Sequence, residues 1–183
     1  DQFERNFEIV FVDANSTDDS VQLIRDFEFR EGIEATLIKS EERIGIYTAW
    51  NRAIKEAQGQ YVMNWNTDDL IYPSGLQIYN QYIQKYPEID FFYSPCCTIG
   101  SQNFDDITGL RNWPQYSQEC GFFKEKYISS GDYEMWLNLS KNGFNFKKIP
   151  ETVGCFYYRK DSVSVKGMGV AQNEDREIQE KYK

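Results

Sequence analysis

Apolar positions in the first half of the chain switch between strand and helix spacing, which predicts alternating β and α elements. Residues 7–13 (FEIVFVD) form a nearly continuous apolar run, typical of a strand buried on both faces. After a polar turn, apolar residues at helical spacing run from Val21 to about Phe29, and Ser16 with Asp19 matches a capping box. The first predicted unit is therefore a strand, a polar turn and a helix.

The same alternation continues downstream. Further strands are predicted at 35–38, 61–65 and 90–94, and helices at 46–58, capped by Gly59, and from Pro73 or Ser74 to just before Pro87. The C-terminal part predicts a helix at 132–142 closed by Gly143, short strands at 144–149 and 153–158, and a helix from about Gln172. Residues 100–118 are polar and rich in Asn, Asp and Gln, so we expect a surface loop or an insertion over a site there.

These units predict an α/β fold with a mostly parallel central sheet and helices on both faces. A length of 183 residues fits a single domain over 1–183. Such sheets bind ligands at the carboxyl ends of their strands. Asp13 ends the first predicted strand, and Asp68 with Asp69 follows the third, so we expect a ligand site at that edge.

The composition restricts the partners and the chemistry. Twenty Lys and Arg against 29 Asp and Glu give a formal net charge of −9, which opposes nonspecific binding to nucleic acid or anionic lipid. We therefore expect no nucleic-acid partner. The chain contains no histidine, so any catalysis would have to use carboxylates.

Cysteine spacing and hydropathy indicate in which cellular compartment the protein is expected. The four cysteines show no CxxC spacing, and we interpret them as reduced structural thiols. No apolar run approaches the roughly 20 residues that a spanning helix needs, and no signal-peptide pattern begins the sequence. We expect a cytoplasmic protein and leave open a peripheral association with the inner face of a membrane.

Two polar turns carry candidate chemistry. In YVMNWNTDDLIYP, the carboxylates of Asp68 and Asp69 could hold a hard divalent cation that bridges to a diphosphate, although acidic pairs also cap helices. The carboxylate of Asp13, followed by the turn at 15–18, could accept hydrogen bonds from a base or ribose. An Asx turn with a helix cap is the alternative for Asp13. The motifs taken singly leave both alternatives open.

Three segments together resemble the family 2 glycosyltransferases and cover nearly the whole chain: FVDANSTDDS, RIGIYTAWNRAIKEAQGQYVMNWNTDD and SGDYEMWLNLSKNGFNFKKIPE. The middle segment is the most specific. Its residues at the family's intervals are Gly45, Ala49, Asn51, Ala53, Ile54, Ala57, Gly59 and Tyr61. The resemblance implies a GT-A fold, a three-layer α/β/α sandwich with a Rossmann-like, mostly parallel sheet.

The resemblance also implies a nucleoside-diphosphate sugar donor, commonly a UDP-sugar, and a divalent metal ion, Mn or Mg. Residues 1–99 would then form the nucleotide-sugar-binding half, and residues 100–183 the acceptor and catalytic half. Asp13 would contact base and ribose, Asp68 the ribose or diphosphate, and Asp69 the metal. Further donor contacts are expected from Asn15, Arg43, Asn51 and Arg159, whereas Arg52 fits a solvated helix face better.

Asp132, in SGDYEMW, resembles the family's catalytic base, which deprotonates the acceptor hydroxyl. An inverting reaction needs one carboxylate on the acceptor side, opposite the leaving diphosphate. A helix cap is the alternative for Asp132, and Glu134 is the reserve candidate for the base.

The chain departs from the family pattern in several places. The segment 157–165 resembles a loop in which relatives often carry a histidine, and here Asp161, Ser162 or nothing replaces it. The family's first strand is expected to be absent from this sequence, and Asp13 is followed by Ala14 instead of a second Asp. The chain also looks short between residues 113 and 121 compared with relatives.

Three functions fit these observations. The first is an inverting glycosyltransferase acting on a hydroxyl of a glycan, lipid-linked or protein acceptor, in polysaccharide or glycoconjugate biosynthesis. The second is a noncatalytic nucleotide-sugar or glycan-binding module of the same fold. The third is a nucleotidyltransferase, which would need a Gly-rich basic loop after the family's first strand. Trp113 and Tyr116 are the aromatic residues most suited to stack on a sugar.

Overall fold

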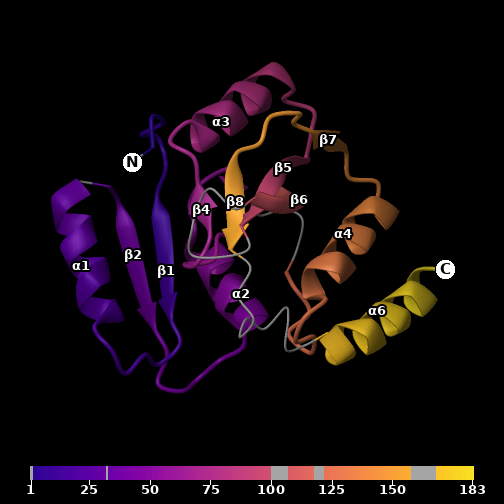
Figure 1. The fold of residues 1–183 in the computed structure, drawn as a ribbon, viewed down its shortest axis with the longest axis horizontal. Coiled ribbons are helices and arrows are strands. Elements are labelled where there is room, and N and C mark those ends of the chain that lie inside the picture. The colour runs from indigo at the N-terminus through magenta and orange to yellow at the C-terminus, as the bar shows by residue number, and fades with distance from the viewer. Residues whose placement is uncertain (1, 32, 100–106, 118–121, 158–167) are drawn as a thin grey trace.

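The computed structural model describes residues 2–31, 33–99, 107–117, 122–157 and 168–183 (Figure 1). The elements are, in chain order, β1 (Ile9–Asp13), α1 (Ser20–Glu31), β2 (Ala35–Lys39), α2 (Ile46–Glu56), β3 (Tyr61–Val62), β4 (Leu70–Ile71), α3 (Gly75–Lys85), β5 (Phe91–Ile99), β6 (Ile107–Ser117), α4 (Gly131–Lys141), β7 (Phe146–Lys148), β8 (Gly154–Tyr157) and α6 (Met168–Tyr182). Within this part of the chain, no helix combines the length and the apolar character that crossing a bilayer requires.

The strands form two sheets. Strands β1 and β2 pair in parallel, with Ile9 opposite Ala35 and Asp13 opposite Lys39. The larger sheet has the order β3-β6-β5-β8-β4, and β7 pairs with β5. Strands β7 and β8 run parallel to β5, whereas β6 runs antiparallel to both β3 and β5, and β4 antiparallel to β8. The expected α/β fold is confirmed, and helices surround both sheets (Figure 1).

Strand β6 corrects one expectation. The segment 100–118 was expected to be a surface loop, but Ile107–Ser117 forms a strand that pairs with β5 from Phe91↔Tyr116 to Ile99↔Ile107. Trp113 and Tyr116 therefore lie on a strand of the sheet. Local composition misled the prediction, because pairing with a neighbouring strand outweighs weak β-propensity.

The segment after α2 also differs from its expectation. The strand predicted at 61–65 contains only Tyr61–Val62, because its pairing with β6 ends at Val62. The chain then turns and forms the two-residue strand β4, which no apolar pattern indicated and which pairs with β8. The intervening residues carry the acidic pair, so the turn is held between two strands of one sheet.

The larger of two buried clusters joins elements that are distant in sequence. Its members come from α2, β5, the segment before α4, α4 itself and α6: Tyr47, Ile54, Phe91, Phe123, Tyr127, Met135, Leu139 and Ile178. Ile178 is fully buried, at 0% exposure, so α6 is anchored in the core. The second cluster, Tyr79, Phe92, Ile149 and Val153, packs α3 against the sheet.

Gly154→Ala tests the close approach of β4 and β8. A Cβ at residue 154 would lie 2.3 Å from the Leu70 carbonyl oxygen and 2.8 Å from the Trp65 ring, and the backbone oxygen cannot move without breaking the strand pair. We expect the substitution to lower the free energy of unfolding by about 2 kcal/mol in guanidinium titrations. The control is Gly169→Ala, since residue 169 has no atom within 4 Å of its Cβ position. Equal stability of the two variants would contradict this packing.

Candidate active site

The acidic turn between β3 and β4 is tied to β8. The Asp69 backbone N–H donates to the Asn66 carbonyl at 3.1 Å, and the Asn66 amide donates to Asp69 Oδ2 at 3.2 Å. Asp69 Oδ1 accepts the backbone N–H of Tyr157 at 3.0 Å. The Asp68 side chain lies exposed beside it. The structure thus fixes the Asp69 carboxylate and presents Asp68 to solvent.

The helix-capping alternative for this pair is wrong. Helix α3 has Ser74 as its N-cap residue, without a side-chain capping hydrogen bond, and β4 separates that position from Asp69. The two carboxylates therefore do not serve the nearest helix start. They remain a pair of hard oxygen donors directly before β4, and carboxylate oxygens are ligands that Mg²⁺ and Mn²⁺ take. Within the described ranges, no cluster of three or more acidic or cysteine side chains is arranged to hold a metal ion.

Asp13 lies buried at the carboxyl end of β1. Its Oδ1 accepts the backbone N–H of Ser16 at 3.1 Å, which is the geometry of a turn closed by an aspartate side chain. Asn15, inside this turn, has a positive φ of 64°, a conformation that Asn tolerates better than most residues. This bond spans three residues, whereas an Asx turn spans two, and α1 begins only at Ser20, so Asp13 does not cap it. The donor contacts of Asp13 and Asn15 stay predictions.

Asp132 lies in the first turn of α4, where Ser130 is the N-cap residue. The residue is half-buried, and its Oδ1 accepts the Tyr133 backbone N–H at 2.9 Å and the Tyr47 hydroxyl at 3.4 Å. Burial raises the pKa of Asp132 above its ordinary value of 3.8, and the negative charge of Asp175 adds to this, while the two hydrogen bonds oppose it. A carboxylate with a raised pKa is a stronger base, which suits proton abstraction from a hydroxyl.

Tyr47 is the neighbour of Asp132 that the sequence did not reveal. Its ring is buried and stacks on Phe123, with 5.6 Å between ring centroids. A Cβ on Gly131 would lie 2.7 Å from the Tyr47 ring, so only glycine at residue 131 permits this approach. The signals available were a tyrosine one residue into a predicted helix and a glycine before Asp132, and neither is specific.

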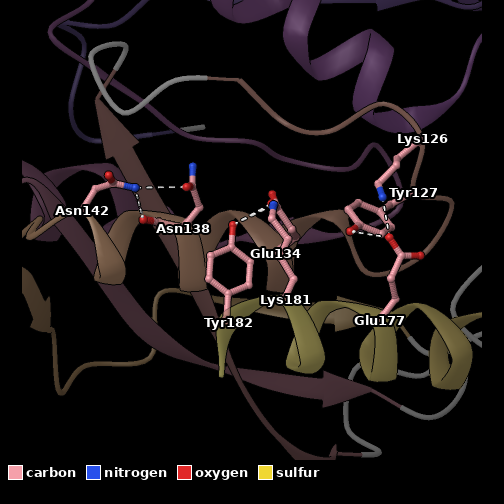
Figure 2. Close-up of polar contacts among 8 residues, drawn as sticks. All are labelled: Lys126, Tyr127, Glu134, Asn138, Asn142, Glu177, Lys181 and Tyr182. Carbon is pink, nitrogen blue, oxygen red and sulfur yellow. Dashed lines mark hydrogen bonds and ion pairs between the residues drawn. The ribbon is translucent and has the colours of Figure 1, made fainter.

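Glu134 does not share the environment of Asp132. Its side chain is fully buried, and Oε1 accepts hydrogen bonds from the Tyr182 hydroxyl at 2.7 Å and from the Lys181 ammonium (Figure 2). Both partners belong to α6, so the carboxylate joins two helices. This arrangement does not support Glu134 as the reserve base.

Asn51 is buried and bound within the protein. Its amide nitrogen donates to the Phe123 carbonyl and to Glu125 Oε1, both at 2.9 Å, and its amide oxygen accepts the Phe123 N–H at 2.8 Å. The side chain therefore joins α2 to the segment before α4. A direct contact of Asn51 with a donor stays a prediction.

The cationic candidates are only partly described. Arg43 is exposed just before α2. Arg52 faces Glu125, whose pKa is lowered first by hydrogen bonds from Asn51 and Thr48 and then by the charges of Lys55 and Arg52. Arg159, with Asp161 and Ser162, lies outside the described residues.

Comparison with known proteins identifies the fold and the family of the chain. S. aureus TarS 1–349, solved in complex with UDP-GlcNAc, superposes with a TM-score of 0.72 at 19% identity, over 85% of this chain and 51% of that one. The mannosyltransferase PcManGT from Pyrobaculum calidifontis, solved with GDP-Man and Mn²⁺, superposes with a TM-score of 0.68 at 20% identity, over 87% and 50%. The chain has a GT-A fold. Residues 1–163 match the family described as Glycosyl transferase family 2, and the chain belongs to this family.

Curated relatives span a range of glycosyltransferases. An uncharacterized glycosyltransferase of Haemophilus influenzae is 25% identical over 167 residues, covering 79% of this chain and 61% of the relative. Pasteurella multocida hyaluronan synthase is 23% identical over 186 residues, covering 90% and 19%. The Escherichia coli protein WfaP, a UDP-Glc:alpha-D-GlcNAc-diphosphoundecaprenol beta-1,3-glucosyltransferase, is 27% identical over 192 residues, covering 90% and 70%. The chain thus spans less than two thirds of the first two of these relatives.

Asp132→Asn is expected to stabilise the fold at neutral pH. Because burial raises the pKa of Asp132, the folded protein binds this proton more tightly than the unfolded chain, and ionisation above the folded pKa costs stability. The melting temperature of the variant should therefore exceed that of the unsubstituted protein at about pH 7, and the difference should vanish below about pH 3, where the carboxyl is protonated in both states. Asp26→Asn, at an exposed position on α1, should show no such trend. A lower melting temperature for Asp132→Asn at neutral pH would contradict the claim that the ionised Asp132 carboxylate lowers stability.

Proposed function

We propose that this chain contains the donor-binding and catalytic residues of an inverting glycosyltransferase. The enzyme would transfer a sugar from a nucleoside-diphosphate donor, with UDP the expected nucleotide, to a hydroxyl group of a glycan, lipid-linked or protein acceptor. The observation that carries the proposal is Asp132, a half-buried carboxylate with a raised pKa, held between Tyr47 and the start of α4. Family membership supplies the reaction class.

The donor side is proposed to lie along the carboxyl ends of β1 and β3. Asp13 would bind base or ribose, Asn15 would assist from its turn, and Asp68 would meet the ribose or diphosphate. The names of two similar proteins support a UDP-sugar, since WfaP uses UDP-Glc and TarS was solved with UDP-GlcNAc. Arg43, Asn51 and Arg159 complete the proposed donor contacts, although the amide of Asn51 is also needed to hold residues 123–125.

The acidic turn fits a divalent cation. Asp69 is the proposed metal ligand, because its carboxylate is held in the acidic turn by Asn66 and by the Tyr157 N–H, and carboxylate oxygens are ligands that Mg²⁺ and Mn²⁺ prefer. Asp68, exposed in the same turn, could supply a second oxygen. A bound Mn²⁺ or Mg²⁺ would neutralise charge on the leaving diphosphate. The Mn²⁺ complex of PcManGT supports this choice.

Asp132 performs the proton step in this proposal. The carboxylate takes the proton of the acceptor hydroxyl as the acceptor oxygen forms a bond to the anomeric carbon. The bond from that carbon to the diphosphate oxygen breaks, and the nucleoside diphosphate leaves with the electron pair. Attack from the face opposite the leaving group inverts the anomeric centre. The Tyr47 hydroxyl, hydrogen-bonded to Asp132, orients the carboxylate.

A noncatalytic nucleotide-sugar-binding module is the second candidate. The complete absence of histidine favours it, because relatives often carry one in the loop that 157–165 resembles. Such a module would bind the donor without releasing the sugar. Turnover therefore separates the two candidates.

The donor site is tested by calorimetric titration of UDP and of GDP, with and without Mn²⁺. We expect UDP binding to depend on Mn²⁺, and Asp69→Ala to weaken it by at least about tenfold, because the variant removes a metal ligand. Asp26→Ala is the control for loss of a carboxylate elsewhere on the surface. Binding that is indifferent to both Mn²⁺ and Asp69 would contradict the proposed metal site, and a preference for GDP would correct the nucleotide.

The proton step is tested by the release of UDP from UDP-GlcNAc, with water as the acceptor. Asp132→Asn should lower the rate by about 10²- to 10⁴-fold without changing the affinity for UDP, because only the base is removed. Glu134→Gln should retain most of the rate and lose stability instead, since Glu134 contacts α6. Loss of the rate in Glu134→Gln, with Asp132→Asn still active, would reverse the assignment.

A further inference from the structure

Helix α6 lies along the chain segment that leads into α4 (Figures 1 and 2). Its side chains Glu174, Glu177 and Lys181 are three and four residues apart, so they share one face of the helix. Ile178 lies on the same side and is buried in the core. The face of α6 that is fixed by the core therefore also carries three charged groups directed at residues 126–134.

Glu174 makes the most extensive of these contacts. Its Oε1 accepts the backbone N–H of Ile128 at 2.8 Å, and its Oε2 accepts those of Ser129 at 2.9 Å and Ser130 at 2.8 Å. Ser130 is the N-cap residue of α4 and makes no side-chain capping bond of its own. A single carboxylate from another helix thus accepts hydrogen bonds from three consecutive N–H groups just before Asp132. Its negative charge also stabilises the N-terminus of α4 through the helix dipole.

The other two contacts differ in strength. Glu177 pairs with Lys126 and accepts the Tyr127 hydroxyl at 3.3 Å, but the charged side chains are 61% and 57% exposed, so this pair contributes little. Lys181 pairs with Glu134, which is fully buried. Loss of Lys181 would leave the buried charge of Glu134 without an ion-pair partner. The strong contacts therefore lie on both sides of Asp132, at residues 128–130 and at Glu134.

We propose that α6 is a positioning element for the transfer reaction, in which Glu174 and Lys181 hold the start of α4 so that Asp132 meets the acceptor hydroxyl. The inference rests on the proposed function, because that function makes Asp132 the base. Neither Glu174 nor Lys181 touches the reacting atoms. Their role is to keep Asp132 and Tyr47 in a fixed position relative to the donor site.

Helix α6 also sets the charge around the base. Among the described residues, the charges of Glu174 and Asp175 from α6 act on the Tyr47–Asp132 pair, and the Tyr133 N–H of α4 donates to Asp132. Burial is the main cause of the raised pKa of Asp132, and the Asp175 charge raises it further. Asp175→Asn should therefore lower that pKa and shift the acid limb of the turnover profile to lower pH, which a purely structural helix would not do.

The test compares Glu174→Gln with Glu180→Gln. Both substitutions remove one carboxylate charge from α6, but Glu180 is exposed. For Glu174→Gln we expect kcat for UDP release from UDP-GlcNAc to fall by about tenfold to a hundredfold, with the Kd for UDP in Mn²⁺ unchanged, because only the acceptor side is displaced. The Glu180→Gln variant should match the unsubstituted protein in both quantities.

Hydrogen exchange at residues 128–130 gives a readout that does not need activity. These amides should exchange faster in Glu174→Gln than in Glu180→Gln. Unchanged exchange would overturn the contact, and faster exchange with unchanged kcat would overturn the positioning role. An unsubstituted protein that binds UDP but releases it from no UDP-sugar would contradict the proposed function and the positioning role together. The exchange result would still show whether Glu174 holds residues 128–130.

Discussion

The contact of Tyr47 with the first turn of α4 is the interaction on which the candidate active site depends. The tyrosine ring fills the space left by the missing side chain of Gly131, and its hydroxyl reaches Asp132. The same ring belongs to the main hydrophobic core, stacked on Phe123. The core and the proposed base are therefore one structural unit, and any change in core packing at Tyr47 is transmitted to the carboxylate.

A second unit supports the proposed metal side. The short strand β4 and its partner β8 hold the acidic turn, because the Tyr157 backbone N–H at the end of β8 binds Asp69. Two residues of pairing suffice here, since Gly154 allows β8 to approach β4 without a Cβ contact. The proposed metal site thus depends on the pairing of β4 with β8, whereas the proposed base depends on contacts among α2, α4 and α6.

Two carboxylates of α4, Asp132 and Glu134, lie where water reaches them poorly. Burial raises the pKa of Asp132, and Glu134 is fully buried with one oxygen, Oε2, lacking a hydrogen-bond partner. Each of these carboxylates costs stability that the surrounding core and the α6 contacts must offset. For Asp132, such a cost is expected where a group is kept reactive by its surroundings. For Glu134, the cost accompanies the contact that joins α4 to α6.

The amino-acid sequence by itself determined the local elements and the two acidic motifs. Apolar periodicity placed β1, α2, α3 and α4 to within a few residues, and motif spacing indicated the family. It did not predict β6, Tyr47 next to Asp132, or Glu174 at residues 128–130. Tyr47 and Asp132 are 85 positions apart, and Glu174 is 44 to 46 positions from its partners. Spacing along the chain reports only neighbours within a strand or a few helical turns, so tertiary packing alone decided which distant groups meet.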